Sequence, residues 1–357
     1  MIMKKIWKTG AIFLLAAVLL FVSGCGKAGE ENDGQETNSE KKVQIGISFD
    51  SFVIERWIRD RDVFVSTAEN LGAEVNVQNA NGDVEQQISQ IKYFIKNKED
   101  VIVVIAIDGN ALKEVVKEAK NSGIKVISYD RLLLNCGSDL YISFDNEKVG
   151  ELMGAALAEQ VPEGGKVFAI YGSQNDNNVK MVQDGLKSVL DQAGIRIVYE
   201  NYCTNWLAEL AFDAVNEGLS QEPDIQGIMC GNDDLAGQAI RALSENFLAG
   251  EIAVVAQDAE LSACQRIVEG TQTMTVYKPV DELASTAAKL AVALGKDKDI
   301  TGMGAALRVR ETIHDGSYEI PYYSIEPVAV TRENMDEVII DSGFHLRDDV
   351  YLNVKDE

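Results

Sequence analysis

Short apolar runs alternate with amphipathic stripes along most of the chain, starting at Val43. The run 101–107 is apolar throughout and stops at Asp108-Gly109, which is typical of a strand buried on both sides in a parallel sheet. Ahead of it, an apolar stripe with steps of four, three and four residues follows Asp83 and indicates one buried helix face. The stripe consists of Val84, Ile88, Ile91 and Ile95. Such alternation predicts parallel sheets with right-handed crossovers and helices on both faces.

The alternation breaks where two β-rich segments follow each other with no helix between them. Residues 125–129 lead into Asp130-Arg131, and residues 140–144 lead into Asp145-Asn146, a good helix N-cap. Such a break is where one α/β lobe ends and the next begins, and ligands of open α/β sheets bind beyond the carboxyl ends of the strands. The length of 357 residues also suggests two domains, since single cores rarely exceed roughly 250–300 residues.

These patterns predict an α/β protein with two similar doubly wound parallel-sheet lobes joined by a three-crossing hinge. The N-terminal lobe is predicted to comprise residues 43–142 plus 279–315, and the C-terminal lobe residues 145–277 plus 320–345. The chain would then cross between the lobes near residues 143, 278 and 320.

The N-terminus has the pattern of a lipoprotein signal peptide, predicted over residues 1–24. Three lysines precede an apolar run over 10–22 that is short for a membrane span, and Val22-Ser23-Gly24-Cys25 looks like a lipobox. Residues 26–42 hold no large apolar side chain, so we predict that the segment 25–42 is a disordered tether. We therefore expect an extracytoplasmic protein, lipid-anchored to the cytoplasmic membrane through Cys25. The alternative is an ordinary signal peptide with an accidental cysteine.

Composition excludes several classes of function. A formal charge of −24 repels phosphate backbones, so we expect no nucleic acid partner. The chain has only two histidines, no GxSxG elbow and no Walker A loop, and its cysteines lack metal-ligand spacing. We therefore predict no enzyme activity, no cofactor and no metal. Four cysteines besides Cys25 permit three pairings, although free, partly buried thiols are the simpler interpretation.

Carboxylates, amides, cationic side chains and two indoles follow the predicted strands in both halves of the chain. Asp and Asn after a strand often serve only as helix caps, which is the interpretation we prefer for Asp83, Asp145 and Asp233. A single Trp at a helix start is more often part of the core. The coincidence across both halves, however, fits a pyranose, whose hydroxyls both donate and accept and whose C–H faces lie flat on Trp. Hydrogen bonds to charged groups contribute roughly 1.5–3 kcal/mol each. The pattern thus favours a sugar site.

The chain from Val43 to about His345 closely resembles the D-xylose-binding proteins of bacterial sugar ABC importers. Several short segments carry this resemblance. They include ERW at 55–57, YDR at 129–131, YISFDNEKVGEL at 141–152 and GTQTMTVYKP at 270–279. The resemblance implies the type I periplasmic-binding fold, with Trp57 and Trp206 sandwiching the sugar ring. It places the sugar contacts on Arg56, Trp57, Asp130, Arg131, Asp176, Asn178, Trp206, Asn232, Asp258 and Lys278.

The resemblance also implies a mechanism and partners. A monomeric receptor would close its lobes on D-xylose or a close aldose and deliver it to a membrane ABC permease. The alternative is a sensing subunit that presents the closed form to a membrane histidine kinase. The segments 172–175 and 203–205 depart from the family pattern, and residues 305–325 look longer than usual.

Overall fold

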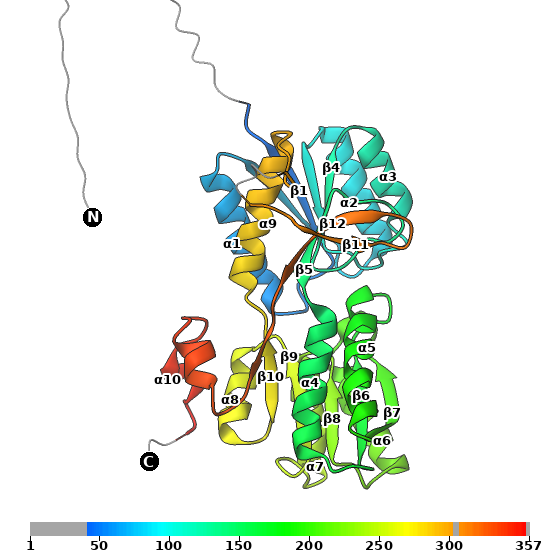
Figure 1. Cartoon of the computed structure of the whole chain (residues 1–357), viewed down its shortest axis with the longest axis vertical. Coiled ribbons are helices and arrows are strands. Elements are labelled where there is room, and N and C mark those ends of the chain that lie inside the picture. The colour runs from blue at the N-terminus through cyan, green and yellow to red at the C-terminus, as the bar shows by residue number, and fades with distance from the viewer. Residues whose placement is uncertain (1–40, 303–306, 355–357) are drawn as a thin grey trace, which may run out of the picture. The chain divides into compact units, whose positions relative to one another are not determined.

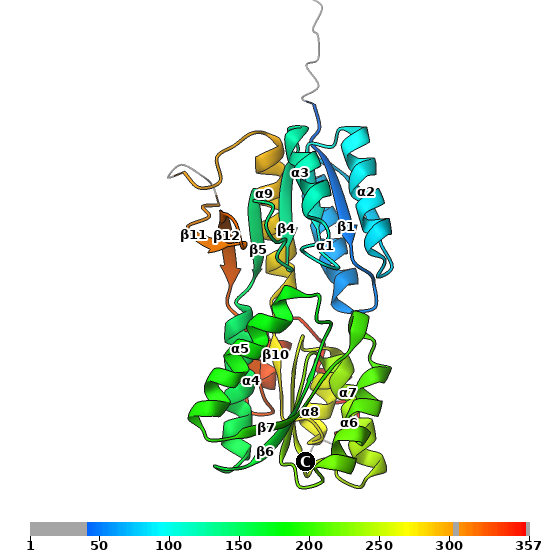
Figure 2. The same cartoon turned by 90° about the vertical axis from the view of Figure 1, so that its right-hand side faces the viewer.

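The computed structural model describes residues 41–302 and 307–354, in which two predominantly parallel sheets form two lobes (Figures 1 and 2). The first sheet has seven strands in the order β11-β12-β5-β4-β3-β1-β2, and the second has six in the order β13-β10-β9-β8-β6-β7. Each sheet has one antiparallel pairing at an edge, β11 with β12 and β10 with β13. The predicted fold class is confirmed.

The N-terminal lobe is built on the seven-stranded sheet with helices on both faces. Its strands are β1 (Gln44–Phe49), β2 (Glu74–Asn79), β3 (Val101–Val104), β4 (Lys125–Tyr129), β5 (Leu140–Phe144), β11 (Glu311–His314) and β12 (Glu319–Ile325). Its helices are α1 (Arg56–Asn70), α2 (Val84–Asn97), α3 (Lys113–Asn121) and α9 (Val280–Gly295).

Strand β3 shows how this lobe buries both faces of its sheet. Val101 and Val103 belong to the apolar cluster that includes α1 and α9, whereas Ile102 and Val104 belong to the cluster of α2 and α3. Successive side chains of a strand point to opposite faces, so an unbroken apolar run is required where helices cover both. The prediction of a doubly buried strand within residues 101–107 is confirmed.

The C-terminal lobe is built on the six-stranded sheet. Its strands are β6 (Lys166–Tyr171), β7 (Arg196–Tyr202), β8 (Gly227–Cys230), β9 (Ala253–Gln257), β10 (Met274–Tyr277) and β13 (Val328–Val330). Its helices are α4 (Asn146–Gln160), α5 (Asn177–Gln192), α6 (Glu209–Gln221), α7 (Asp233–Glu245) and α8 (Leu261–Glu269), followed near the end by a π-helical turn (Asp336–Ile340) and α10 (Arg347–Val350).

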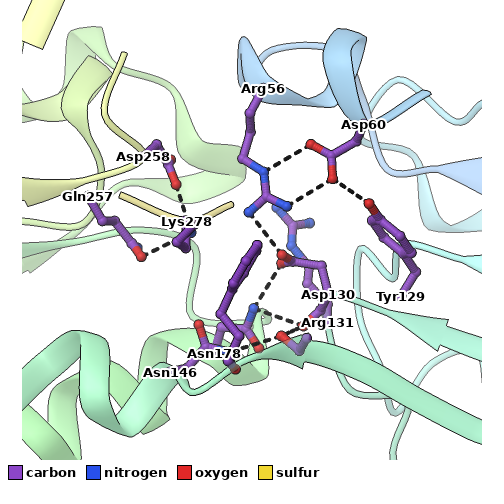
Figure 3. A network of polar contacts seen from close by, with 12 residues as sticks. Arg56, Asp60, Tyr129, Asp130, Arg131, Asn146, Asn178, Gln257, Asp258 and Lys278 are labelled. Carbon is purple, nitrogen blue, oxygen red and sulfur yellow. Dashed lines mark hydrogen bonds and ion pairs between the residues drawn. The ribbon is translucent and has the colours of Figure 1, made fainter. Parts of the chain in front are cut away.

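Helices α4 and α5 pack with their backbones in direct contact. A Cβ atom on Gly150 would lie 2.0 Å from the carbonyl oxygen of Val182, and one on Gly185 would lie 2.0 Å from that of Glu147. Only glycine permits this approach. The contact packs the start of α4 against the middle of α5, and the first residues of the two helices place Asn146 and Asn178 at the interlobe boundary (Figure 3).

One lobe boundary differs from the prediction. Strand β12 pairs in parallel with β5 from Tyr322–Tyr141 to Ile325–Phe144, so residues 319–325 belong to the N-terminal lobe's sheet. The third crossing therefore lies between Ile325 and Val328 rather than near 320, and the placement of 320–325 in the C-terminal lobe is wrong. Pairing with a distant strand decides which sheet this strand joins, and the local sequence does not record that pairing.

The structure tests the prediction for the cysteines but not the predictions for the N-terminal segment. The predicted signal peptide over 1–24, the lipidated Cys25 and most of the tether lie outside the described residues. In the described part of the chain, Cys136, Cys203, Cys230 and Cys264 are buried free thiols, and no helix is long and apolar enough to cross a membrane.

Candidate functional site

An interlobe cavity with about 320 Å³ of space between its lining atoms lies where the strand ends of both sheets meet. Nine of the ten side chains predicted to contact the sugar line it. These nine are Arg56, Trp57, Asp130, Arg131, Asp176, Asn178, Trp206, Asp258 and Lys278, joined by Ile54, Asn146 and Gln257.

Asn232 is the predicted residue that does not line this cavity. Its side chain is 1% exposed, and its Oδ1 accepts a hydrogen bond from the Leu235 amide at 3.0 Å, which caps α7. Its Nδ2 has no hydrogen-bond partner among the described residues. Asn232 thus acts first as a helix cap, and the sequence interpretation that gave the cap to Asp233 is wrong.

Strand ends explain why these side chains converge. Asp130 and Arg131 follow β4, Asp258 follows β9, and Lys278 follows β10. Parallel strands end at the same edge of their sheet, and the two sheets present these edges to each other across the cavity. Asp130 has a φ of 60° and Asp258 a φ of 104°, so the chain turns sharply as it leaves each strand.

Arg56 is at the centre of a buried network in the N-terminal lobe (Figure 3). Its Nη2 and Nε donate to the two carboxylate oxygens of Asp60 at 3.0 and 3.2 Å, and its Nη1 lies 2.9 Å from Asp130 Oδ2. The hydroxyl of Tyr129 also donates to Asp60. A planar guanidinium held by one bidentate partner has its remaining donors fixed in direction. Asp60 therefore orients Arg56 toward the cavity side.

Asp130 is ionised in this network. Burial alone would raise its pKa, but the positive charges of Arg56, Lys278 and Arg131 outweigh burial, and the pKa lies below its ordinary value. An ionised carboxylate is an acceptor only, which suits a hydroxyl that needs an acceptor.

Arg131 joins carboxylates of the two lobes. Its Nη1 donates to Asp50 Oδ2 at 2.7 Å in the N-terminal lobe, and its Nε lies 2.7 Å from Asp176 Oδ2 in the C-terminal lobe. Asn178 also spans the boundary, since its Nδ2 donates to the backbone carbonyl and Oδ1 of Asp130 at 3.1 and 3.0 Å. These contacts hold the two strand edges together directly.

Lys278 has two partners on the opposite wall of the cavity (Figure 3). Its Nζ lies 2.7 Å from Asp258 Oδ1 and donates to Gln257 Oε1 at 3.0 Å. Gln257 in turn donates to the carbonyl of Gly231 at 2.6 Å. The ammonium is thus fixed in position at the end of β10.

The two indoles come from different lobes and are both buried. The Arg131 guanidinium carbon lies 5.6 Å from the ring centroid of Trp57 and 6.0 Å from that of Trp206. Neither indole N–H has a hydrogen-bond partner within residues 41–302 and 307–354. Trp206 also packs on Gly172, where a Cβ atom would lie 2.2 Å from its ring, so only glycine leaves room for this indole.

Sequence reasoning did not select four residues that complete the site, namely Asp50, Asp60, Asn146 and Gln257. Asp60 had a usable signal, because it lies four residues after Arg56 and therefore on the same helix face. Asn146 and Gln257 adjoin the selected strand ends. Asp50 directly follows β1, but its partner Arg131 is 81 residues away, and no local pattern reveals that pair.

Comparisons with known proteins place this chain among sugar-binding proteins of one family. A family model described as periplasmic binding protein domain matches residues 45–299. The D-xylose-binding periplasmic protein of Haemophilus influenzae is 43% identical over 87% of this chain and 93% of its own length, and that of Escherichia coli is 43% identical over 85% and 92%. A carbohydrate transporter solute binding protein from Chloroflexus aurantiacus, solved with D-glucose, is 26% identical with a TM-score of 0.78 over 87% of this chain and 98% of that one.

Proposed function

This chain belongs to the periplasmic binding protein family as a sugar-binding member, and from that premise we propose that it binds D-xylose for an ABC importer. Its relatives are binding proteins rather than enzymes, which confirms the prediction of no enzyme activity. The identity of 43% to two D-xylose-binding proteins supports the choice of sugar.

One observation supports the proposal most strongly. Charged side chains, amides and two indoles from both lobes surround one cavity, and two indole N–H groups there have no partner among the described residues. Buried polar groups are normally hydrogen-bonded, so such groups favour a polar ligand. The ring hydroxyls of a pyranose would bind the carboxylates and cations, and its apolar faces would contact Trp57 and Trp206.

Contacts from both lobes imply binding by closure. A sugar that contacts Asp130 in one lobe and Asp258 in the other stabilises the form in which the two are close. The hinge would be the three crossings at residue 145, residues 278–279 and residues 326–327. We propose that a membrane permease recognises this closed form. A membrane histidine kinase would bind the same surface, so the surface alone does not distinguish the two partners. Neighbouring genes for a permease and an ATPase would support import, and genes for a kinase and a response regulator would support sensing.

We predict that D-xylose binds more tightly than D-glucose by about 1–3 kcal/mol, the range for one extra small group in a fitted pocket. The cavity offers little space beyond one ring, because buried side chains with fixed partners line it. Isothermal titration calorimetry with a panel of pentoses and hexoses measures this difference. A clear response to a hexose with no heat from D-xylose would refute the choice of sugar.

We also predict that Cys25→Ser releases the protein from the membrane fraction into the soluble extracytoplasmic fraction. The reason is that the lipobox cysteine would carry the only lipid, and the following residues are polar. Fractionation followed by immunoblotting measures the distribution, with Cys136→Ser, a buried free thiol, as the matched control. Equal membrane retention of the Cys25→Ser variant and the parent would contradict the anchor.

A further inference from the structure

The C-terminal segment of the chain reaches the turn that carries Asp258. This segment, residues 331–354, packs beside α8 of the C-terminal lobe (Figure 1), and its Ile339 shares a buried apolar cluster with Ala259. In the same segment, His345 Nε2 lies 2.8 Å from the backbone carbonyl oxygen of Ala259. A histidine near the end of the chain therefore contacts the residue that directly follows a predicted sugar contact.

The turn at Asp258 has a strained backbone. The φ angles are 104° at Asp258 and 53° at Ala259, a region that side chains other than glycine rarely adopt. Such a conformation persists where the surrounding contacts hold it in place. The Asp258 amide donates to the Val276 carbonyl at 2.8 Å, and the Ala259 amide donates to Thr275 Oγ1 at 3.1 Å. These bonds fix the amides of the turn to the neighbouring strand β10.

His345 fixes the carbonyl side of the same turn. A carbonyl oxygen can only accept, so His345 Nε2 donates the hydrogen bond. Burial lowers the pKa of His345, so at about pH 7 the imidazole is neutral and carries its proton on Nε2. Cys264 Sγ lies 3.6 Å from the same oxygen, but a thiol is a weak donor. His345 is therefore the stronger of these two donors to the Ala259 carbonyl.

Phe344 fixes the position of His345 through contacts with both lobes. Its ring packs edge-on against Tyr277 of the C-terminal lobe, with ring centroids 4.8 Å apart. Arg59 of α1, in the N-terminal lobe, places its guanidinium carbon 4.6 Å from the Phe344 ring centroid and donates to the Phe344 carbonyl at 3.3 Å. Arg59 is itself held by the two carboxylate oxygens of Asp281 at 2.6 and 2.7 Å. The residue before His345 is thus packed from both sides.

We propose that His345 is a positioning residue for sugar binding, which holds the strained turn so that the Asp258 carboxylate stays in the interlobe cavity. The inference rests on the proposed function and adds a residue to the same site. Asp258 lines the cavity and pairs with Lys278 at 2.7 Å (Figure 3), whereas His345 is not among the residues that line it. His345 therefore acts on the sugar through the Ala259 carbonyl and the turn rather than by contact.

Replacing His345 with leucine removes the donor and keeps apolar bulk. We expect His345→Leu to weaken D-xylose binding at least about tenfold, the loss of roughly one hydrogen bond's worth of affinity. His345→Gln should recover binding to within about threefold of the parent, because the glutamine amide nitrogen is as many bonds from Cα as imidazole Nε2. Fluorescence titration of the full-length protein measures both, since Trp57 and Trp206 line the cavity.

The chain's other histidine provides the matched control. His314 is exposed on β11 and does not line the cavity, so His314→Leu should bind D-xylose as the parent does. Urea denaturation verifies that each variant is folded under the conditions of the titration. Parent-like affinity in His345→Leu, or no recovery of affinity in His345→Gln, would overturn the proposal.

A double-mutant cycle with Asp258 separates positioning from a general structural role. Asp258→Ala removes the carboxylate that His345 is proposed to position. In that background His345→Leu should weaken D-xylose by less than about threefold, although it costs about tenfold in the parent. Equal losses in both backgrounds would show that His345 does not act through Asp258, and would overturn the positioning role.

Nitrogen-15 NMR of the imidazole rings tests the hydrogen bond without any sugar. The chain has only two histidines, so His345→Gln identifies the signals of His345 directly. We expect the proton of the neutral His345 ring on Nε2 at about pH 7, and a ring protonated on Nδ1 alone would overturn the proposal. If the parent binds another monosaccharide and not D-xylose, the proposed function is wrong, and the same variants titrated with that sugar decide the role of His345 separately.

Discussion

Replacing Arg131 with alanine is expected to abolish measurable sugar binding and to lower the free energy of unfolding by about 3–5 kcal/mol. Arg131 neutralises two buried carboxylates at 2.7 Å, Asp50 in one lobe and Asp176 in the other. Removal of the cation leaves both charges buried without their partner, which is far more costly than loss of a surface ion pair. Calorimetric titration and urea denaturation measure the two effects.

The stability loss should depend on pH in a defined direction. Burial raises the pKa of both Asp50 and Asp176 above the ordinary value, although Arg131 opposes it. Without Arg131 these pKa values rise further, so the folded variant binds protons that the unfolded chain does not. Stability of the variant then falls as pH rises, and its deficit relative to the parent is larger at about pH 8 than at about pH 5.

Two further variants serve as controls for Arg131→Ala. Arg241 is exposed and lies 3.6 Å from the exposed Glu245, so Arg241→Ala should change stability by less than about 0.5 kcal/mol. Arg131→Lys should be intermediate, because one ammonium cannot replace a guanidinium that meets two carboxylates through separate nitrogens. Two results would contradict this account. One is a loss of unfolding free energy in Arg131→Ala that does not change with pH, and the other is a sugar affinity within about tenfold of the parent's.

Replacing Glu260 with glutamine is expected to stabilise the protein at about pH 8, by on the order of 2–5 kcal/mol. Burial is the largest cause that raises the pKa of Glu260, followed by the charge of Asp233, and the pKa rises to about 10. The acidic groups that raise the pKa of Glu260 are Asp233, Asp234, Asp258 and Glu55. The cation near these acids is Arg266, which acts to lower the pKa of Asp233 and Asp234.

The sign follows from proton binding. Glu260 has a folded pKa above its ordinary value of 4.5, so the folded state binds a proton that the unfolded state releases. Its contribution to stability is complete below about pH 4.5 and falls by up to about 1.4 kcal/mol per pH unit as pH rises toward 10. Glutamine resembles the protonated side chain and cannot titrate, so the variant loses this slope.

Urea denaturation of the parent and Glu260→Gln between about pH 5 and pH 9 measures the difference in slope. Glu251→Gln is the control, because Glu251 is exposed and its replacement should change stability by less than about 0.5 kcal/mol. If Glu260→Gln is less stable than the parent at about pH 8, or if both have the same slope, Glu260 is ionised in the folded protein and the interpretation is wrong.

Periodicity alone determined much of the fold. The apolar run that contains β3 predicted a strand covered on both faces, since only such a strand needs apolar side chains at every position. Asp83 and Asp145 predicted helix starts, and both cap their helices through side-chain oxygens, because capping requires only a short polar residue beside its own helix. These features are local, so the sequence alone specifies them.

Candidate site residues could be selected because they follow strands, and parallel strands end at one edge of a sheet. The structure brings nine of the ten around one cavity, and whether they bind a sugar there is what the titrations test. Asn232 shows the limit of this reasoning, since an amide after a strand has the same sequence pattern whether it lines a cavity or caps a helix.

The tertiary structure alone decided which charged groups pair and which sheet β12 joins. Arg131 pairs with Asp50 and Asp176, and β12 pairs with β5 more than 170 residues earlier in the chain. Such partners are chosen by the packing of distant segments, which no local period records. The sequence by itself thus determined most of the alternation of strands and helices and the sheet edge where polar residues gather. The pairing of charges across that edge required the folded chain, because electrostatic attraction depends on distance in space and not along the sequence.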